Sequence, residues 1–209
     1  MSKGLKKVRE ELEVYAEFHK LVDEWVNELP RESELGTLAC DEKGCAACCW
    51  KLVTLSIPEM MYVVFDLLDR SSEKKVDELE NRCMEQIRLM DARGFNASDD
   101  YADSWFGLKI PCILLDGQRL CRVYEKRPVV CRSFFVFDGE EQCSGPSRSL
   151  VKQLDNRAVV QHLIETDIEV CKELRVTASP MPLPAAMRAA IYWWRYGLYE
   201  LRSWLKKAT

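Results

Sequence analysis

Apolar side chains recur every three or four residues near the start of the chain. This face comprises Leu5, Val8, Leu12, Tyr15, His19, Val22, Val26 and Leu29. Such spacing places side chains on one side of an α-helix. Pro30 follows directly and cannot continue a helix. The pattern therefore predicts an amphipathic helix over residues 5–29.

A second helical region follows a stretch without periodicity. Ser56 and Pro58 are typical of a helix N-cap and first turn. They predict a helix over about 58–69, and a second helix over about 72–92 that ends at Gly94.

Helical patterning returns in the last third of the chain. It predicts helices over residues 147–176 and 185–206, the second of them rich in Trp and Tyr. The repeated prolines at 180, 182 and 184 predict an extended linker between these helices.

The segments between the helices favour turns and short strands. Residues 31–50 lack periodicity and are expected to form a loop. Residues 113–115 and 120–124 flank Asp116-Gly117, which predicts a short hairpin, and 129–137 is expected to form another short strand.

Together these elements predict a mainly α protein with a small, irregular, turn-rich β element that carries a cysteine knot. We expect one domain over residues 1–209, with a cysteine-cluster core over 40–145 that is stabilised by a metal or cluster and flanked by helices.

The composition departs from that of an ordinary globular domain in one respect. The 209 residues include ten cysteines, while the net charge of −4 gives no strong signal for nucleic-acid binding. The N-terminal residues lack the apolar stretch of a signal peptide, and no segment has the length and apolarity of a membrane span. These features predict a cytoplasmic protein, in which clustered thiols bind metal more often than they form disulfides.

The cysteines fall into two groups. Cys45, Cys48 and Cys49 form a CxxCC pattern preceded by Cys40, and the second group is Cys112, Cys121, Cys131 and Cys143. A CxxC turn can direct two sulfurs at one ion, and soft thiolates favour zinc, cuprous copper or iron–sulfur clusters. Adjacent thiolates usually diverge, so Cys48 and Cys49 can serve two irons of one cluster or two nearby sites. The sequence leaves one shared site and two four-ligand sites both open.

Cys83 and Cys171 differ from these two groups. Each lies within an expected helix and has no partner at ligand spacing, which favours a small buried side chain over a ligand.

These cysteine patterns resemble those of the CxxCxxCC cysteine-cluster family, also described as zinc- or iron-chelating and as YkgJ-like. The resemblance rests on Cys45-Ala46-Ala47-Cys48-Cys49, on Pro111-Cys112 followed by apolar residues, on the run from Cys121-Arg122-Val123-Tyr124 through Arg127-Pro128 to Cys131-Arg132, and on Cys143. The chain departs from the family pattern in the spacing from Cys40 to Cys45 and in having Ala46 where the family usually has glycine.

The resemblance implies a metal or iron–sulfur site, with the eight cysteines of the two groups as ligands, and no particular reaction. An iron–sulfur cluster is the favoured cofactor, and zinc is the alternative. Some larger proteins with a similar cluster are flagellin lysine methylases, so a modifying enzyme is a further interpretation. No glycine-rich dinucleotide loop or Walker motif accompanies the cysteines.

Two arginines and two histidines are further candidates for the site. Arg127 and Arg132 flank Cys131 and suit charge compensation of an anionic centre, capture of a carboxylate or phosphate, or a structural ion pair. His19 and His162 are each interpreted first as packing residues, with metal ligation as the alternative.

The leading functional prediction is a protein that binds an iron–sulfur cluster or metal and takes part in redox chemistry or in the modification of a protein or small molecule. The alternatives are a zinc-stabilised structural or interaction module and a metal-dependent modifying enzyme. An unidentified protein or small-molecule partner is expected, and the aromatic C-terminal helix is a candidate surface for homo-oligomerisation.

Overall fold

The computed structural model describes residues 3–30, 32–33, 36–37, 46–94, 105, 107–137 and 155–208. Within these ranges the protein is mainly helical, as the sequence predicts. Its long helices are α1 (Lys3–Leu12), α2 (Val14–Asn27), α3 (Ile57–Asp69), α4 (Glu73–Ala92), α7 (Arg157–Leu174) and α8 (Leu183–Ala208).

The short elements lie between these helices. They are the 3-10 helices η1 (Ala47–Trp50) and η2 (Tyr124–Lys126), the four-residue helix α6 (Val129–Arg132), and the strands β1 (Glu32–Ser33), β2 (Gly36–Thr37), β3 (Thr54–Leu55) and β4 (Met181–Pro182). β1 pairs antiparallel with β2, and β3 pairs antiparallel with β4.

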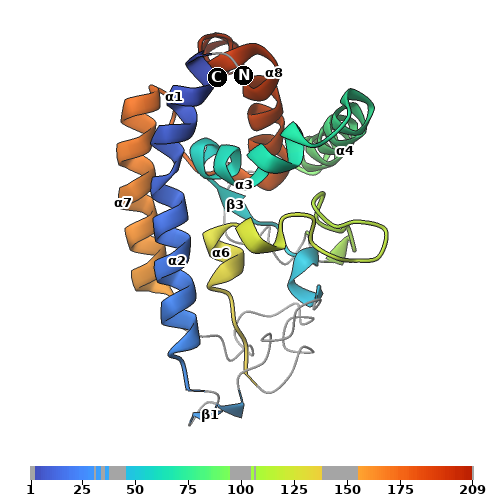
Figure 1. Cartoon of the computed structure of the whole chain (residues 1–209). Coiled ribbons are helices and arrows are strands. Elements are labelled where there is room, and N and C mark those ends of the chain that lie inside the picture. The colour runs from blue at the N-terminus through green and yellow to red at the C-terminus, as the bar shows by residue number, and fades with distance from the viewer. Residues whose placement is uncertain are drawn as a thin grey trace.

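The first two helices and α7 form one side of the molecule. α1 and α2 follow one another in nearly the same direction, and α7 runs beside them (Figure 1). The single amphipathic helix expected over 5–29 is interrupted at Glu13, where the N–H bonds back to the Glu10 carbonyl in a tightened turn. The predicted face is otherwise correct, since Val8, Leu12 and Tyr15 are all buried.

α3 occupies the centre of the fold. It packs against α8 and contacts α1 and α7, and the side chains of Met60, Met61 and Leu68 are fully buried. Its start is as predicted, because Ser56 caps the helix by accepting the Glu59 N–H at 3.1 Å.

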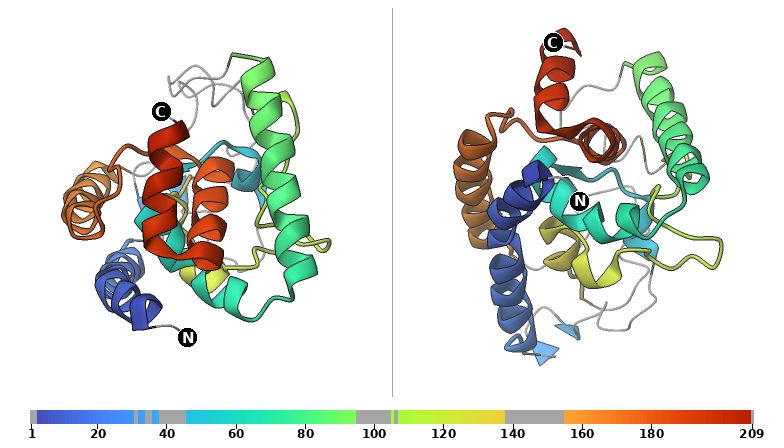
Figure 2. Two further views of the ribbon diagram at one scale, coloured as in Figure 1. Left: turned by 90° about the horizontal axis from the view of Figure 1, so that it is seen from above. Right: turned by 45° about the horizontal axis from the view of Figure 1, so that its top comes forward.

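α8 is a helical hairpin. Gly197 has φ 86° and ψ 174°, a conformation that essentially only glycine adopts, and it divides the helix into two arms (Figure 2). The first arm buries Trp193 against Phe65 of α3. The sequence predicts one continuous helix over 185–206, so this reversal is a difference from the expectation.

The proline-rich linker before α8 is partly ordered by pairing. Leu55 lies opposite Met181 in the β3–β4 ladder, and the Leu183 N–H donates to the Val53 carbonyl at 2.8 Å. The short ladder anchors the start of α8 to the segment that leads from η1 into α3.

The expected strand over 129–137 is wrong in its first half. Val129–Arg132 forms α6, after which Phe135 and Phe137 pack against Val26 of α2 and against Leu29, which follows that helix. The expected hairpin around Asp116-Gly117 is present as turns closed by one antiparallel bridge between Leu115 and Cys121.

Candidate metal centre

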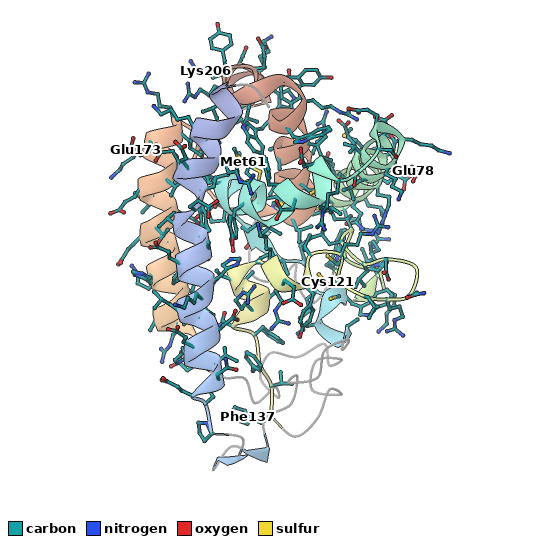
Figure 3. All side chains as sticks on the ribbon, viewed as in Figure 1. Met61, Glu78, Cys121, Phe137, Glu173 and Lys206 are labelled. Atoms are coloured by element: carbon teal, nitrogen blue, oxygen red, sulfur yellow. The ribbon has the colours of Figure 1, made fainter. Side chains whose placement is uncertain are left out.

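Three chain segments bring thiols into the same part of the molecule. η1 carries Cys48 and Cys49, the 112–121 turns carry Cys112 and Cys121, and α6 carries Cys131. The Cys112 N–H donates to the Cys49 carbonyl at 2.7 Å, which joins the first segment to the second through the backbone. Figure 3 labels Cys121 below α4 in this region.

The 112–121 turns are held by local hydrogen bonds. The Asp116 carboxylate accepts the N–H groups of Gln118 and Leu120 at 2.8 and 2.9 Å, an Asx-type arrangement that closes the loop. The Arg122 N–H donates to the Leu114 carbonyl at 2.9 Å. This geometry returns the chain, so that Cys112 and Cys121 lie on adjoining limbs.

The Cys-x-x-Tyr-x-x-Arg-Pro-x-x-Cys run has a structural basis. Its first half forms η2, and Pro128, which has no N–H to donate, separates this turn from the start of α6. The Cys131 N–H then donates to the Pro128 carbonyl at 2.9 Å. The motif is therefore a turn, a proline break and a short helix that returns Cys131 toward Cys121.

The pKa shifts show that the five described thiols are electrostatic neighbours. Burial raises the pKa of Cys131 well above its usual value, and the nearby thiols of Cys48, Cys112 and Cys121 raise it further. The pKa of Cys49 is raised first by its hydrogen bond with Cys48, and also by burial and by Cys112 and Cys131. Without a cation, each thiolate would disfavour the others in a poorly solvated place.

Backbone N–H groups also point at the sulfurs. The Leu114 N–H donates to the Cys112 sulfur at 3.5 Å, and burial raises the pKa of Cys112 to about 11 despite this bond. A hydrogen bond from the Val123 backbone likewise lowers the pKa of Cys121, against a larger upward shift from burial. Such N–H groups stabilise negative charge on sulfur once the thiol is ionised.

Arg127 and Arg132 play different structural parts, which spacing alone could not distinguish. Arg132 is buried and forms an ion pair with Asp23 of α2 at 2.5 Å, while its other terminal nitrogen donates to the Glu125 carbonyl. Arg127 stacks on Tyr124 at 4.5 Å, and its charge lowers the pKa of Cys121. Its buried Nε has no hydrogen-bond partner among the described residues.

Glu59 is a buried acid beside this site that the sequence pattern did not reveal. Its Oε1 accepts the Val129 N–H at 2.6 Å, and its other oxygen has no described partner. Burial and then Asp167 raise the pKa of Glu59 to about 8, so the group holds a proton at neutral pH. The available signal was an acid in the otherwise apolar first half of α3.

Glu59 fixes the position of α6. Its place three residues after Ser56 is typical of a capping box, in which the acid bonds back to the N-cap N–H. Here the side chain instead satisfies the first free N–H of α6, the helix that carries Cys131. The buried Tyr15 and Ser56 hydroxyls both donate to Asp167 of α7, which secures the start of α3.

The two histidines lie apart from the thiols in their contacts. His19 packs edge-on against Tyr62 at 5.1 Å, and burial, Arg132 and Lys126 together lower its pKa to about 3. His162 is exposed, pairs with Glu165 at 3.8 Å and contacts the Phe18 ring. Neither histidine has a cysteine among its described contacts, which accords with packing roles for both.

The remaining cysteines divide into two sets. Cys40, Cys45 and Cys143 lie outside the residues that the structure describes. Cys83 and Cys171 are buried, and Cys171 donates its S–H to the Thr177 carbonyl at 3.3 Å. None of the seven described cysteines forms a disulfide. Among the described residues, no three His, Cys, Asp or Glu side chains are arranged closely enough to hold a metal ion without adjustment.

Comparison with known proteins bears directly on this site. A family model described as CxxCxxCC, a putative zinc- or iron-chelating domain, matches residues 39–147, just over half of the 209-residue chain. The chain belongs to the CxxCxxCC family. The match includes every cysteine of the two groups and excludes Cys171, although it includes Cys83. No curated protein and no solved structure matches the chain.

The CxxCxxCC membership accords with the donor set in this structure. Thiols are soft donors suited to zinc or iron, and a backbone hydrogen bond joins two of the three segments that carry the five described thiols. Their raised pKa values are the penalty that a bound cation would relieve. In chemical type, these donors therefore suit a thiolate-bound zinc or iron centre. No helix in the described part of the chain is long and apolar enough to span a membrane.

Proposed function

We propose that this protein binds an iron–sulfur cluster through the cysteines of η1, the 112–121 turns and α6. Cys48, Cys49, Cys112, Cys121 and Cys131 are the described ligand candidates, and Cys40, Cys45 and Cys143 complete the proposed set. The observation that carries the proposal is the convergence of these segments, in which the Cys112 N–H donates to the Cys49 carbonyl at 2.7 Å and the thiols raise one another's pKa values. Four thiolates suffice for a [2Fe–2S] or [4Fe–4S] cluster, so some of these eight cysteines have other roles or serve a second site.

The adjacent pair Cys48 and Cys49 favours a centre with more than one metal atom. Their thiols hydrogen-bond to each other. Cys48 raises the pKa of Cys131, and Cys131 raises the pKa of Cys49. Two residues that are adjacent in sequence are poorly placed to provide two ligands of one tetrahedral zinc ion. A cluster offers separate irons, so each thiolate can bind without the same strain.

Arg127 and the N–H groups of Leu114 and Val123 support an anionic centre. Hydrogen bonds to ligand sulfurs and the charge around a cluster set its reduction potential. Arg127 lies where its charge stabilises the Cys121 thiolate. We propose Arg127 as the charge-compensating residue and assign Arg132 to fixing α6 against α2.

Cysteine variants of the full chain test the ligand assignment. Cys112→Ser and Cys121→Ser should each lose most of the iron and of the visible absorbance when the protein is purified without oxygen, because serine is a much poorer ligand for a soft metal. Cys171→Ser is the matched control, since its hydroxyl can keep the bond to the Thr177 carbonyl. Full metal retention in both ligand variants would show that the assignment is wrong.

A specific feature favours a reactive centre over a sealed structural one. Cys121 lines a cavity of about 300 Å³, together with Asp66, Arg122, Tyr124 and other residues. We propose that a small molecule reaches the edge of the centre through this cavity, as modification chemistry there would require. Addition of cyanide to the reduced protein should change its electron paramagnetic resonance spectrum. An unchanged spectrum at saturating cyanide would favour a closed cluster with a structural role.

A further inference from the structure

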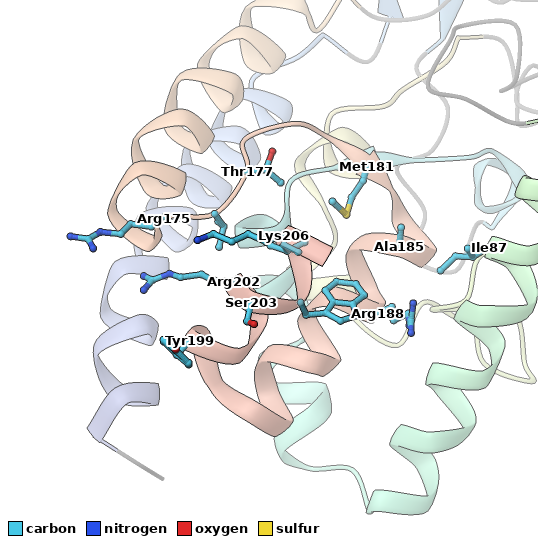
Figure 4. A pocket seen from close by; sticks show the side chains of 13 residues that line it. Ile87, Arg175, Thr177, Met181, Ala185, Arg188, Tyr199, Arg202, Ser203 and Lys206 are labelled. Atoms are coloured by element: carbon cyan, nitrogen blue, oxygen red, sulfur yellow. The ribbon is translucent and has the colours of Figure 1, made fainter. Parts of the chain in front are cut away.

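A second cavity lies away from the cysteines, at the opposite end of α7 from its start near α6. It has a volume of about 900 Å³ and lies between the segment after α7, both arms of α8 and Ile87 of α4 (Figure 4). Pockets for small organic ligands commonly have volumes of about 300–1,000 Å³. No cysteine is among its described lining residues, so a ligand bound there does not depend on the proposed metal centre.

The charged residues that line the cavity all have the same sign. Arg175, Arg188, Arg202 and Lys206 contribute to its wall, and no Asp or Glu does so among the described lining residues. Figure 4 shows Arg175 and Arg202 toward one end and Arg188 toward the other. Cations gathered around a concave, low-dielectric wall attract an anion more strongly than the same charges spread over a flat surface.

Carboxylates of this protein do not neutralise the three arginines within the described part of the chain. Arg188 lies over the Trp204 ring at 5.2 Å and forms no described ion pair. Arg202 donates two N–H groups to the Leu174 carbonyl at 2.8 and 2.6 Å, which leaves its charge uncompensated by an acid. Arg175 follows the end of α7 in the left-handed conformation and is exposed.

Arg195 of α8, unlike the three cavity arginines, is paired with acids. It pairs with Glu73, Asp77 and Glu80 of α4, and this ion-pair cluster ties α8 to α4. The acids that face α8 from α4 are thus directed at Arg195. The cavity arginines remain available to an outside anion.

The rest of the cavity wall is largely apolar. Ile87, Val176, Met181, Ala185, Trp204 and Leu205 line it. Such a wall suits a hydrocarbon chain or ring and would gain little from a small inorganic ion. Guanidinium groups bind carboxylate and phosphate oxygens through paired hydrogen bonds.

We propose that this cavity binds an amphipathic organic anion, with a carboxylate or phosphate head held by the lining arginines and an apolar body held against Met181 and its apolar neighbours. The combination of a single sign of charge, unpaired arginines and an apolar wall determines this ligand class. The site is separate from the proposed cluster and takes its own ligand.

Calorimetric titration of the full-length, metal-loaded protein tests the proposal. The probes are decanoate and decyl phosphate below their micellar concentrations, with decyltrimethylammonium as the cationic match and acetate and inorganic phosphate as heads without a chain. Either decyl anion, or both, should bind at least about tenfold more tightly than the cation and the bare heads. Comparison of the two decyl anions identifies the preferred head. Equal binding of the cation, or no binding of either decyl anion at 1 mM, would overturn the proposal.

Substitutions locate the binding to the cavity. Arg188→Met should weaken binding of the preferred decyl anion by about tenfold or more, because it removes the charge and retains an unbranched apolar side chain. Lys207→Met is the matched control, since Lys207 is an exposed cation next to a lining residue and does not itself line the cavity. Equal affinity in Arg188→Met and the unmodified protein would contradict the assignment.

A second variant tests the same assignment in case Arg188→Met does not fold. Arg175→Asn removes another lining charge at an exposed position whose left-handed backbone asparagine tolerates. It should also weaken binding of the anion while unfolding at the same temperature as the parent. Unchanged affinity in both folded variants would place the ligand elsewhere.

Discussion

At the scale of single residues, the interior around α3 contains more polar groups than the sequence pattern indicates. Glu59, Asp167 and His19 are all buried, and each is held at an unusual protonation equilibrium by its surroundings. Glu59 and Asp167 anchor α6 and α3 through hydrogen bonds. His19 differs, because neither of its ring nitrogens has a partner among the described residues.

His19 should make the folding stability decrease at acidic pH. Its pKa is about 3 in the folded protein and ordinarily 6.5, so the unfolded chain binds a proton below pH 6.5 that the folded protein does not. Folding stability contributed by the neutral ring is therefore present above pH 6.5 and is lost as the pH falls toward 3. His19→Phe should remove this loss and keep the edge-on contact with Tyr62.

The free energy of unfolding, measured with urea at pH 7.5 and pH 5, checks this expectation. The advantage of His19→Phe over the parent should increase by about 2 kcal/mol on going to pH 5, the value of 1.5 pKa units. His162→Phe is the matched control, because it makes the same substitution at the other histidine of the chain, in an exposed position. An advantage of His19→Phe that is the same at both pH values would contradict the account.

At the scale of elements, the backbone reversal at Gly197 shapes the C-terminal part of the protein. The two arms of α8 are brought together there, with Tyr192 of the first arm stacked on Trp204 of the second at 5.3 Å. The reversal also folds the second arm toward the 900 Å³ cavity, because Tyr199 and Trp204 line its wall.

Gly197→Ala should destabilise the protein by about 1–3 kcal/mol, because a Cβ strains a backbone at φ 86° and ψ 174°. No neighbouring atom lies within 4 Å of the new Cβ, so conformational strain and not collision is the expected cause. Gly107→Ala provides the control, since its Cβ also meets open space and its φ lies outside the left-handed range. Equal thermal unfolding midpoints for the two variants would refute the role given to Gly197.

The elements also show where prediction from sequence succeeds. α3 and α4 are predictable nearly to the residue, because Ser56 and Gly94 carry strong local signals. Val129 and Val130 are β-branched and favour a strand locally, which is why a strand is expected there. The structure has the helix α6 instead. The helix is instead set by Pro128 and by the Glu59 carboxyl from another part of the chain, a tertiary contact that local patterns cannot contain.

At the scale of the whole molecule, the helices serve to hold the thiol-bearing segments in register. α4 contributes directly, since the Gln86 amide donates to the Pro111 carbonyl at 2.9 Å beside Cys112. α2 and α3 fix α6 through Asp23 and Glu59. The matched family region ends at residue 147, so α7 and α8 add a layer beyond it that packs onto α3.

The cysteine spacing predicts Cys112, Cys121 and Cys131 as ligand candidates, and their role as ligands stays a prediction. The turns that join them are encoded locally by Asp116 and Pro128, so this part of the local structure is predictable from sequence. The pattern could not separate the structural Arg132 from Arg127, because Asp23 lies 109 positions away in sequence. Glu59 and the anion cavity depend on packing between distant helices, which periodicity along one helix does not reveal.

Localisation in the cytoplasm and self-association through the C-terminal helix remain predictions. Most of the apolar surface of α8 is used within the molecule, with Trp193 and Leu201 fully buried and Tyr196 and Tyr199 exposed. The exposed pair is the part of this helix available to another chain.

The most direct test of the central claim is the content of iron, zinc and acid-labile sulfide in the full chain purified without oxygen. Our account predicts a brown protein in which iron and sulfide are present together in comparable amounts. A colourless protein with stoichiometric zinc and no sulfide would contradict it, and would make the thiol cluster a zinc-stabilised structural module.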